Sequence, residues 1–313
     1  MLIGIVRSGL VESRHPVTVA AVDAGGALVF RSGDDQGTSF FLRSAAKPFQ
    51  AAVSRRNGAS LAPEQLAVAA GSHGGQPVHV ALVKDMLAGV GLGPEHLLCP
   101  PAWPYTEGAL RRLAAAGVGA PQRVFHNCSG KHAAMLRACV ARGWTLEYTN
   151  PNHPLQREIL DEVAGATGVS PGPVGVDGCG VPTFRSTVAG LARAFARLAA
   201  DPELAPVADA MARFAPLTSD GDRPEAELAR WCHAAVKGGA QGCVGVAWLG
   251  GLGVAAKCWS GQAAPAMVAV IATLRRLGAL PDHGFEMLAE IARPVVPGGG
   301  HPVGRLQLLE GPW

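Results

Sequence analysis

Strand patterns occupy both ends of this chain, and an alanine-rich helical pattern fills its middle. Val17 to Val22 and Ala27 to Arg31 flank a tight turn, which predicts two antiparallel strands. Gly242 to Leu249 and Leu252 to Trp259 have the pattern of a second hairpin, and a short strand is expected near Arg305 to Leu309. Because strand runs that enclose a run of helices favour a layered arrangement, we expect both ends to build one antiparallel sheet.

The expected fold class is therefore α/β of the α+β type, with a helical region inserted into the sheet. Residues 1–43 and 238–313 are predicted to form a mixed region of sheet and helix, and residues 44–237 a mainly helical region of the same compact unit. Several expected helices begin with proline in the first turn, where its missing N–H removes no hydrogen bond. The helices are predicted near residues 63–70, 77–88, 132–142, 155–166, 182–200, 224–236, 263–277 and 285–292.

Composition narrows the partners that this chain is expected to have. The net charge is only +3 and the basic residues are dispersed, so we expect no nucleic-acid partner. Gly238 to Ala256 is an uncharged stretch of 19 residues, but seven of them are glycine, which favours a hairpin over a membrane span. The start lacks the basic segment of a signal peptide, so a cytoplasmic protein is expected. Charged residues make up 16%, below the roughly 25% of soluble domains, which favours a homo-oligomer.

Lysine is scarce, at five of the 27 basic residues. Arginine keeps its proton in proteins, whereas a buried lysine can act as a base or a ligand, so each lysine here is a candidate for amine chemistry. Lys84 is expected on the polar side of a helix and Lys237 in a last helical turn, where any cation suits the helix dipole. Lys47, Lys131 and Lys257 lie in less ordinary surroundings.

Two serines have the placement of active hydroxyl groups. Ser44 precedes Lys47 by three residues where sheet gives way to helix, which is typical of a Ser/Lys nucleophile and base. Pro48 disfavours the α conformation at Lys47, so this spacing holds only approximately. Ser72 lies in the glycine-rich segment Gly71 to Gly75, which is either a second active site segment or a plain turn with a serine cap.

A third lysine lies at the end of the second predicted hairpin. Lys257, shortly before Gly261, resembles the Lys-x-Gly element that lines the sheet edge of penicillin-recognising enzymes. A strand-end lysine without chemical function explains the same residues.

Cysteines and histidines gather in one segment of the helical region. His126 to His132 holds four side chains able to bind a metal, and it is not a phosphate loop, because Phe125 replaces the required glycine. Cys128 and Cys179 would supply two soft ligands, but zinc generally needs three or four, and buried inert cysteines are the common alternative. The seven cysteines form no CxxC pairs, so reduced thiols are expected.

Four blocks, in this order, resemble the signature blocks of one enzyme family. They are Arg43-Ser-Ala-Ala-Lys-Pro-Phe-Gln50, Ser72-His-Gly-Gly75, His126-Asn-Cys-Ser-Gly-Lys-His132 and Val176-Asp-Gly-Cys-Gly-Val-Pro-Thr-Phe184. The chain resembles the rhizobial-type (class 3) L-asparaginases of the asparaginase II family. This resemblance implies a fold similar to the serine β-lactamases and glutaminases, a homodimer, and hydrolysis of the small molecule L-asparagine to L-aspartate and ammonia.

The resemblance also implies roles for individual residues. Two Ser/Lys pairs would carry the covalent chemistry: Ser44 as nucleophile with Lys47 as its base, and Ser72 with Lys257. A zinc ion that shapes or orients the site would be bound by Cys128, Lys131 and Cys179. Contacts to the substrate or to neighbouring groups would come from Arg43, His132 and Asp177.

Three other functions remain open at the level of sequence. A glutaminase or another small-amide amidohydrolase would share these motifs, because pocket shape sets the accepted amide length. A metal-dependent hydrolase would use Cys128, Cys179 and histidines. A non-catalytic amino-acid or β-lactam sensor would bind or acylate without turnover, although two Ser/Lys pairs disfavour it.

Overall fold

The chain folds around an antiparallel sheet of eight strands in the computed structural model, which describes residues 1–33 and 37–310. The strand order is β11-β12-β1-β2-β10-β9-β8, and β3 also pairs with β2. Strands from both chain ends therefore build one sheet, as predicted. They are β1 (Leu2–Arg7), β2 (Leu10–Asp23), β3 (Leu28–Ser32), β8 (Ala234–Gly239), β9 (Cys243–Trp248), β10 (Leu252–Cys258), β11 (Val295–Gly298) and β12 (His301–Leu308).

Helices cover both faces of this sheet, so its central strands are mostly apolar where the sheet is covered. In β10, Ala255 packs into the core on the side of α7 (Val188–Ala200), whereas Val254 packs into the core on the side of α11 (Ala263–Arg276). Successive strand residues point to opposite faces, which explains why β10 is buried at every position. Gly253 leaves room for the α7 backbone, which a Cβ atom there would overlap.

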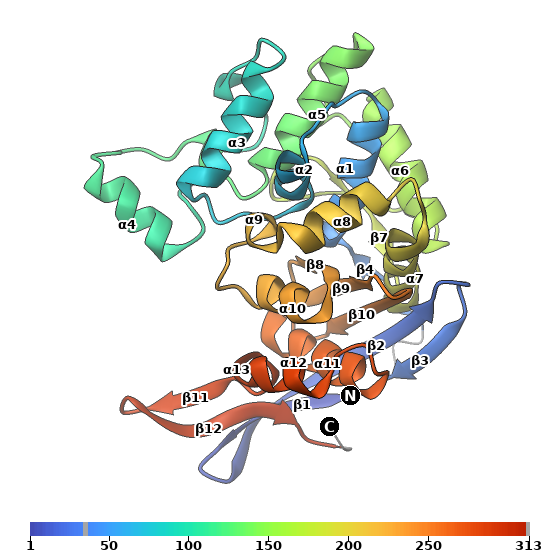
Figure 1. Cartoon of the computed structure of the whole chain (residues 1–313), viewed down its shortest axis with the longest axis vertical. Coiled ribbons are helices and arrows are strands. Elements are labelled where there is room, and N and C mark those ends of the chain that lie inside the picture. Colours follow the sequence, from blue (N-terminus) through green and yellow to red (C-terminus); the bar gives the residue numbers. More distant parts are fainter. Residues whose placement is uncertain (34–36, 311–313) are drawn as a thin grey trace.

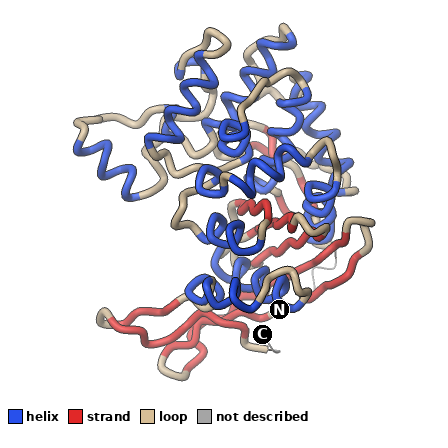
Figure 2. The backbone as a smooth tube through the Cα atoms, in the orientation of Figure 1, coloured by secondary structure: helices blue, strands red, loops and turns tan. Residues whose placement is uncertain are grey.

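Most helices of the inserted region stand on one side of the sheet (Figures 1 and 2), whereas α10 (Pro224–Cys232) packs into the core on the side of α11. Of the inserted helices, α4 (Glu107–Ala115) projects furthest to the left in Figure 1. Short helices α12 (Asp282–Met287) and α13 (Ala289–Ala292) follow α11. The helices of the inserted region, besides α7, are α1 (Lys47–Arg56), α2 (Pro63–Ala70), α3 (Pro77–Ala88), α4 (Glu107–Ala115), α5 (Ser129–Arg142), α6 (Pro154–Thr167), α8 (Ala205–Arg213), α9 (Ala215–Thr218) and α10 (Pro224–Cys232), with 3₁₀ turns η1 (Arg43–Ala46), η2 (Pro94–His96) and η3 (Arg123–Phe125).

The proline-started helices α2 and α3 have the predicted bounds, but two other predicted helices are wrong in part. The helix expected from Pro182 starts at Val188, because Thr187 caps it. The residues before Thr187 form two short strands. These are β6 (Pro182–Thr183), which pairs with β5 (Gly175–Val176), and β7 (Arg185–Ser186), which pairs with β4 (Phe40–Phe41). The helix expected to reach Val236 ends at Cys232.

The early end of α10 changes the position of a lysine. His233 adopts a left-handed conformation with φ of 49° and ends the helix, and β8 begins at the next residue. Lys237 therefore lies on a strand and not in a last helical turn. The boundary predicted between the helical region and the second sheet segment, at residues 237 and 238, falls inside β8.

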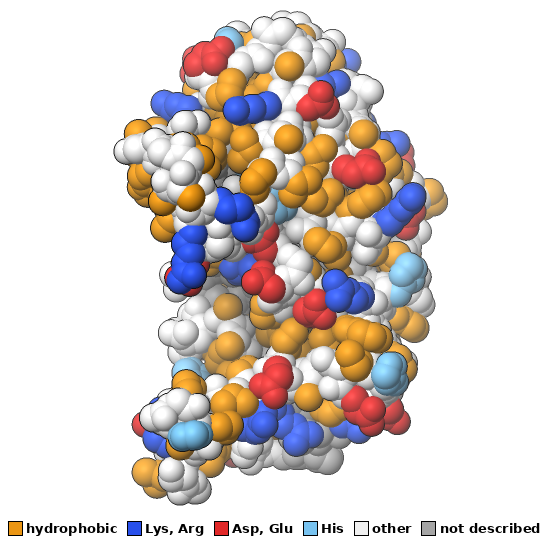
Figure 3. Space-filling view, turned by 60° about the vertical axis from the view of Figure 1, so that its left-hand side comes forward, with side chains coloured by type: hydrophobic (Ala, Val, Ile, Leu, Met, Phe, Trp, Pro, Cys, Tyr) orange, Lys and Arg blue, Asp and Glu red, His pale blue; other side chains and the backbone are white. Residues whose placement is uncertain are grey.

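The predicted hairpin across Gly238 to Ala256 is confirmed as β9 and β10. Within the described residues, no helix is long and apolar enough to cross a membrane. On the face shown in Figure 3, charged side chains of both signs are scattered among apolar ones.

Candidate active site

A cavity of about 360 Å³ opens where β8 meets the helical region. Ser44 comes from η1, Ser72 from the loop after α2, and Lys237 from β8. Three segments far apart in sequence thus bring two hydroxyl groups and an amine to one cavity. The remaining lining residues are Tyr105, Asn127, Thr218, Ser219, Arg223, Glu225, Val236, Gly238, Gly239, Ala240, Gln241, Gly242, Gly261 and Ala263.

Ser44 lies on a strained turn. Arg43 has a φ of 51°, a left-handed conformation that is uncommon for residues other than glycine. Its backbone N–H donates to Thr183 Oγ1 at 3.2 Å, and its Nε donates to Asp177 Oδ1 at 2.6 Å. These two contacts hold the backbone that presents Ser44 to the cavity.

Lys47 follows Ser44 by one tight turn and is fully buried. Its Nζ donates to Gly71 O at 2.7 Å, to Ser72 Oγ at 2.8 Å and to Asn127 O at 3.2 Å. The sequence predicted Lys47 as partner of Ser44, and the hydrogen bond in the structure is to Ser72. Lys47 therefore joins the Ser44 turn to the second hydroxyl group.

Backbone hydrogen bonds to the end of α9 and to the residue after it fix the loop that carries Ser72. Ser72 N donates to Thr218 O at 2.7 Å, and Gly74 N donates to Ser219 O at 2.9 Å. A Cβ atom at Gly74 would overlap the buried Asp220 carboxylate, so glycine is needed at this close approach.

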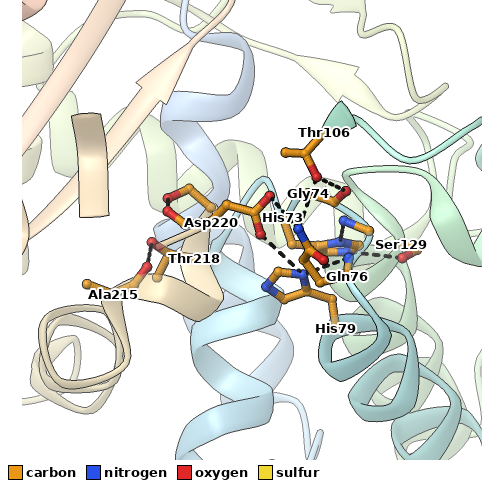
Figure 4. A network of polar contacts seen from close by, with 11 residues as sticks. His73, Gly74, Gln76, His79, Thr106, Ser129, Ala215, Thr218 and Asp220 are labelled. Atoms are coloured by element: carbon orange, nitrogen blue, oxygen red, sulfur yellow. Dashed lines mark hydrogen bonds and ion pairs between the residues drawn. The ribbon is translucent and has the colours of Figure 1, made fainter. Parts of the chain in front are cut away.

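Side chains around Asp220 connect a third segment to this loop. Gln76 Nε2 donates to Thr106 Oγ1 at 3.1 Å and contacts Asp220 Oδ2 at 3.4 Å, and His79 Nδ1 lies 3.9 Å from Asp220 Oδ1 (Figure 4). The ring of His79 stacks on the ring of His73, with centroids 5.0 Å apart. The Ser72 loop is thus held from several sides.

His73 links the same loop to α5. Gly75 N donates to His73 Nδ1, and Ser129 Oγ donates to Val124 O, so His73 Nε2 carries the proton that it shares with Ser129 Oγ at 3.0 Å. Burial, followed by the charges of His79 and Lys47, lowers the pKa of His73 well below its ordinary value. A neutral histidine therefore braces the Ser72 loop against the start of α5.

Lys237 is the cavity amine that the sequence prediction missed. Burial, reinforced by the charge of Lys47, lowers its pKa to about 7. Gly239 packs against the Ser44 turn, since a Cβ atom there would lie 2.7 Å from Leu42 O. The signal for this role was present in the sequence, because Lys237-Gly238-Gly239 is itself a Lys-x-Gly element. The error in the end of α10 concealed it.

Lys257, the predicted partner of Ser72, lies elsewhere. It belongs to β10, which β9 separates from β8. Its Nζ donates to Gln241 O and to Cys258 O and lies 5.7 Å and 5.5 Å from the ring centres of Phe40 and Trp259. Lys257 supports the backbone at the cavity rim and is not among the lining residues.

The three residues implied as zinc ligands do come together. Cys128, Lys131 and Cys179 are buried, and Lys131 Nζ lies 3.1 Å from Cys179 Sγ. A hydrogen bond with Cys179 and the charges of Lys47 and Lys131 lower the pKa of Cys128 well below its ordinary value, against the effect of burial. Burial alone would lower the pKa of Lys131, but Cys179 and Cys128 raise it.

These donors suit zinc, which binds nitrogen and sulfur ligands, once Lys131 gives up its proton, because an ammonium group has no lone pair. His132 Nε2 is buried beside them without a hydrogen-bond partner in the described part of the chain, while His132 Nδ1 bonds to Tyr148 Oη at 2.9 Å. Burial lowers the pKa of His132 to about 4, so this imidazole is neutral. Within residues 1–33 and 37–310, no three His, Cys, Asp or Glu side chains form a metal cluster, so the fit depends on Lys131.

Arg43 and Asp177 form a closed ion pair, and neither lines the cavity. Burial opposes ionisation of Asp177, but Lys131 and Arg43 together lower its pKa. His132 is fully buried behind Cys179. The structure thus places the three residues predicted to contact substrate around the Cys128/Lys131/Cys179 cluster.

The whole chain matches one known family: the L-asparaginase II profile covers residues 3–308. The chain belongs to the L-asparaginase II family. No curated protein matches it. The predicted resemblance is confirmed at the level of this family.

One solved structure supports the fold. Mglu in its glutamate form is 16% identical, with a TM-score of 0.50, over 85% of this chain and 61% of that chain. Mglu in its tris and glutamate form is 15% identical, with a TM-score of 0.46, over 85% of this chain and 60% of that chain. This L-asparaginase II family member thus spans about three fifths of those chains, and its fold is the β-lactamase-like one that was predicted.

Proposed function

We propose that this protein hydrolyses L-asparagine to L-aspartate and ammonia through an ester on Ser44. The observation that carries the proposal is the convergence of Ser44, Ser72 and Lys237 on one cavity, with Lys47 bonded to Ser72. Membership of the L-asparaginase II family favours amide hydrolysis over the sensor and metal-hydrolase alternatives. Two hydroxyl groups beside two amines are the groups that covalent acyl transfer requires.

Acylation begins at Ser44. Lys237 takes the Ser44 proton, because an amine with a pKa of about 7 is partly neutral at neutral pH. Ser44 Oγ attacks the side-chain amide carbon, and backbone N–H groups at the cavity wall stabilise the oxyanion. The C–N bond then breaks as Ser72 Oγ gives its proton to the leaving nitrogen and Lys47 returns a proton to Ser72.

Deacylation reverses these proton movements. Water gives its proton to Lys47 through Ser72, and its oxygen attacks the aspartyl ester carbon. The Ser44 oxygen leaves and recovers its proton from Lys237. Both lysines thereby return to their starting states, and one water is consumed for each ammonia released.

We propose that zinc binds at Cys128, Lys131 and Cys179, as the family resemblance implies. When bound, the ion would supply a fixed positive charge that orders polar groups near Lys47. The protein's own contribution is to place this cluster at the start of α5, where His73 and Ser129 connect it to the Ser72 loop.

L-Glutamine is the second candidate substrate. The observation in its favour is the similar fold of Mglu in its glutamate form, since glutamate is the product of glutamine hydrolysis. One methylene distinguishes the two amides, which pocket shape typically discriminates by about 10- to 200-fold.

Acid quenching during turnover tests the proposed chemistry. We expect intact-protein mass spectrometry to show an added aspartyl group on Ser44 when L-asparagine is present. Lys47→Arg and Lys237→Arg should both abolish turnover, because arginine cannot give up its proton. The mechanism would be contradicted if a variant with slowed deacylation turned over without any acyl-protein. It would also be contradicted if either arginine variant kept full activity.

A further inference from the structure

Two opposite charges lie in the cavity besides Lys237. Arg223 and Glu225 both line it, together with Ser44 and Ser72. Their side chains are 31% and 19% exposed, so both are largely withdrawn from water yet reachable from the cavity. The acylation chemistry above uses neither group.

Both side chains emerge at the start of α10, which packs on β8. Glu225 lies against the strand that carries the cavity amine, since a Cβ atom at Gly238 would be 2.6 Å from Glu225 Oε1. The Arg223 guanidinium lies over the ring of Tyr105, 4.7 Å from its centre. The two charges are thus held at fixed places on the cavity wall.

Arg223 and Glu225 are close but not joined by a hydrogen bond. Arg223 Nε lies 3.8 Å from Glu225 Oε2, beyond hydrogen-bond range. By contrast, Arg43 Nε lies 2.6 Å from Asp177 Oδ1, and neither residue lines the cavity. Arg223 and Glu225 therefore remain able to form hydrogen bonds with a ligand. Arg43 and Asp177 are already bonded to each other.

We propose that Arg223 and Glu225 form the subsite that recognises the α-carboxylate and α-ammonium groups of an amino-acid amide. This inference rests on the proposed function and assigns the specificity of the same cavity. A free amino acid carries one charge of each sign beside its α-carbon, so adjacent charges of opposite sign complement it, and guanidinium groups suit carboxylates. The neutral side-chain amide is then left to extend toward Ser44.

The subsite explains selectivity for free amino acids over simple amides. A substrate without the ammonium group leaves Glu225 partly desolvated and unpaired, and one without the carboxylate does the same to Arg223. Because both charged side chains are largely withdrawn from water, such a loss is severe, as in sites that reject ligands lacking a hydrogen-bonding group.

The test compares Glu225→Gln and Arg223→Gln with a matched pair on the same helix. Glu227 and Arg230 form an ion pair of 3.2 Å that is outside the cavity lining, so Glu227→Gln and Arg230→Gln are the controls. With L-asparagine, each cavity variant should raise KM about tenfold or more with kcat changed by less than about threefold, and the controls should leave both constants unchanged.

Truncated ligands assign each charge to its partner. Succinamate lacks the α-ammonium group, and β-alaninamide lacks the α-carboxylate. Their inhibition constants against L-asparagine hydrolysis should follow a crossed pattern: Glu225→Gln leaves succinamate affinity unchanged, and Arg223→Gln leaves β-alaninamide affinity unchanged. An effect of Glu225 through Lys237 alone would instead shift the pH profile toward lower pH without changing KM, because the charge of Glu225 raises the pKa of Lys237.

Unchanged KM in both cavity variants, or equal losses for the intact and truncated ligands, would overturn the inference. Its failure is distinct from failure of the proposed function. If the wild-type protein releases no ammonia from L-asparagine or L-glutamine, the function fails, and calorimetric titration with L-aspartate then tests the subsite directly. Binding of L-aspartate that weakens about tenfold in both cavity variants would support it, and absent or unaltered binding would refute it.

Discussion

At the scale of single residues, Lys237 is the group on which the proposed chemistry most depends. The folded protein lowers its pKa from the ordinary 10.5 to about 7, chiefly by burial. The unfolded chain therefore binds this proton more tightly than the folded protein does. Between pH 7 and pH 10.5 the folded state gains stability as pH rises, and below pH 7 the full penalty remains.

Removing the Lys237 amine should therefore raise stability while it abolishes activity. We expect Lys237→Met to increase the free energy of unfolding at pH 7 by roughly 2–4 kcal/mol. Denaturant unfolding should show that this difference shrinks toward pH 10. A variant less stable than the wild type at pH 7 would mean that the amine is not held at a lowered pKa.

The same amine sets the expected dependence of the rate on pH. A base with a pKa of about 7 gives a kcat/KM that increases with pH through neutrality, because only the neutral amine accepts the Ser44 proton. Initial rates of ammonia release between pH 5 and pH 9 would measure this. A rate that stays constant from pH 6 to pH 8 would exclude Lys237 as the base.

The cysteine and lysine cluster makes a separate prediction. Cys128→Ser combined with Cys179→Ser should lose bound zinc, because the serine hydroxyl is a poor substitute for a thiolate. Elemental analysis of the purified variant gives the answer, with Cys139→Ser as a control from elsewhere on α5. Zinc retained in full by the double variant would place the metal at another site.

Sequence reasoning selected residues that the structure brings together, but not all of their partners. Ser44 and Ser72 line the cavity, and Lys131 lies against Cys179. The roles assigned to these residues stay predictions. Lys47 bonds to Ser72, and Lys237 occupies the place in the cavity that was predicted for Lys257. Side-chain pairing across distant segments depends on the packing of whole elements, which local spacing does not contain.

At the scale of elements, the contact between β8 and the Ser44 turn decides the cavity geometry. Gly239 is packed between Leu42 O and Cys243 Sγ, so any side chain there pushes strand and turn apart. We expect Gly239→Ala to lower stability by about 1–3 kcal/mol and to lower kcat more than tenfold. Calorimetry and ammonia release would measure the two effects.

A glycine with open space provides the control for that substitution. Gly108 in α4 has only the distant end of Arg112 near its missing Cβ, so Gly108→Ala should be neutral or stabilising, by up to about 1 kcal/mol. If Gly239→Ala were equally harmless, the close approach of β8 to the Ser44 turn would not control the site.

Element boundaries mark the limit of prediction from sequence. The proline-started α2 and α3 were predictable, because a proline in the first turn is a strong local signal. The start of α7 and the end of α10 were not, since Thr187 and the left-handed His233 act through local hydrogen bonds and backbone conformation. The wrong end of α10 placed Lys237 in a helix instead of on β8, so its position in the cavity was not predicted.

At the scale of the whole molecule, the strand patterns at both chain ends were sufficient to predict the sheet. Its internal order was not predictable, because pairing of β1 with β12 and of β2 with β10 joins residues from opposite ends of the chain. The homodimer and the cytoplasmic location stay predictions. Light scattering coupled to gel filtration should give twice the chain mass of 32.1 kDa, and a mass of one chain would contradict the dimer.

Ammonia release by the wild-type protein and by Ser44→Ala, measured in parallel with L-asparagine and L-glutamine, tests the central claim most directly. The proposed function predicts rapid release from L-asparagine, little from L-glutamine, and none from either amide in a folded Ser44→Ala variant. Undiminished release by that variant would contradict Ser44 as the nucleophile, and no release by the wild-type protein from either amide would contradict the proposed activity.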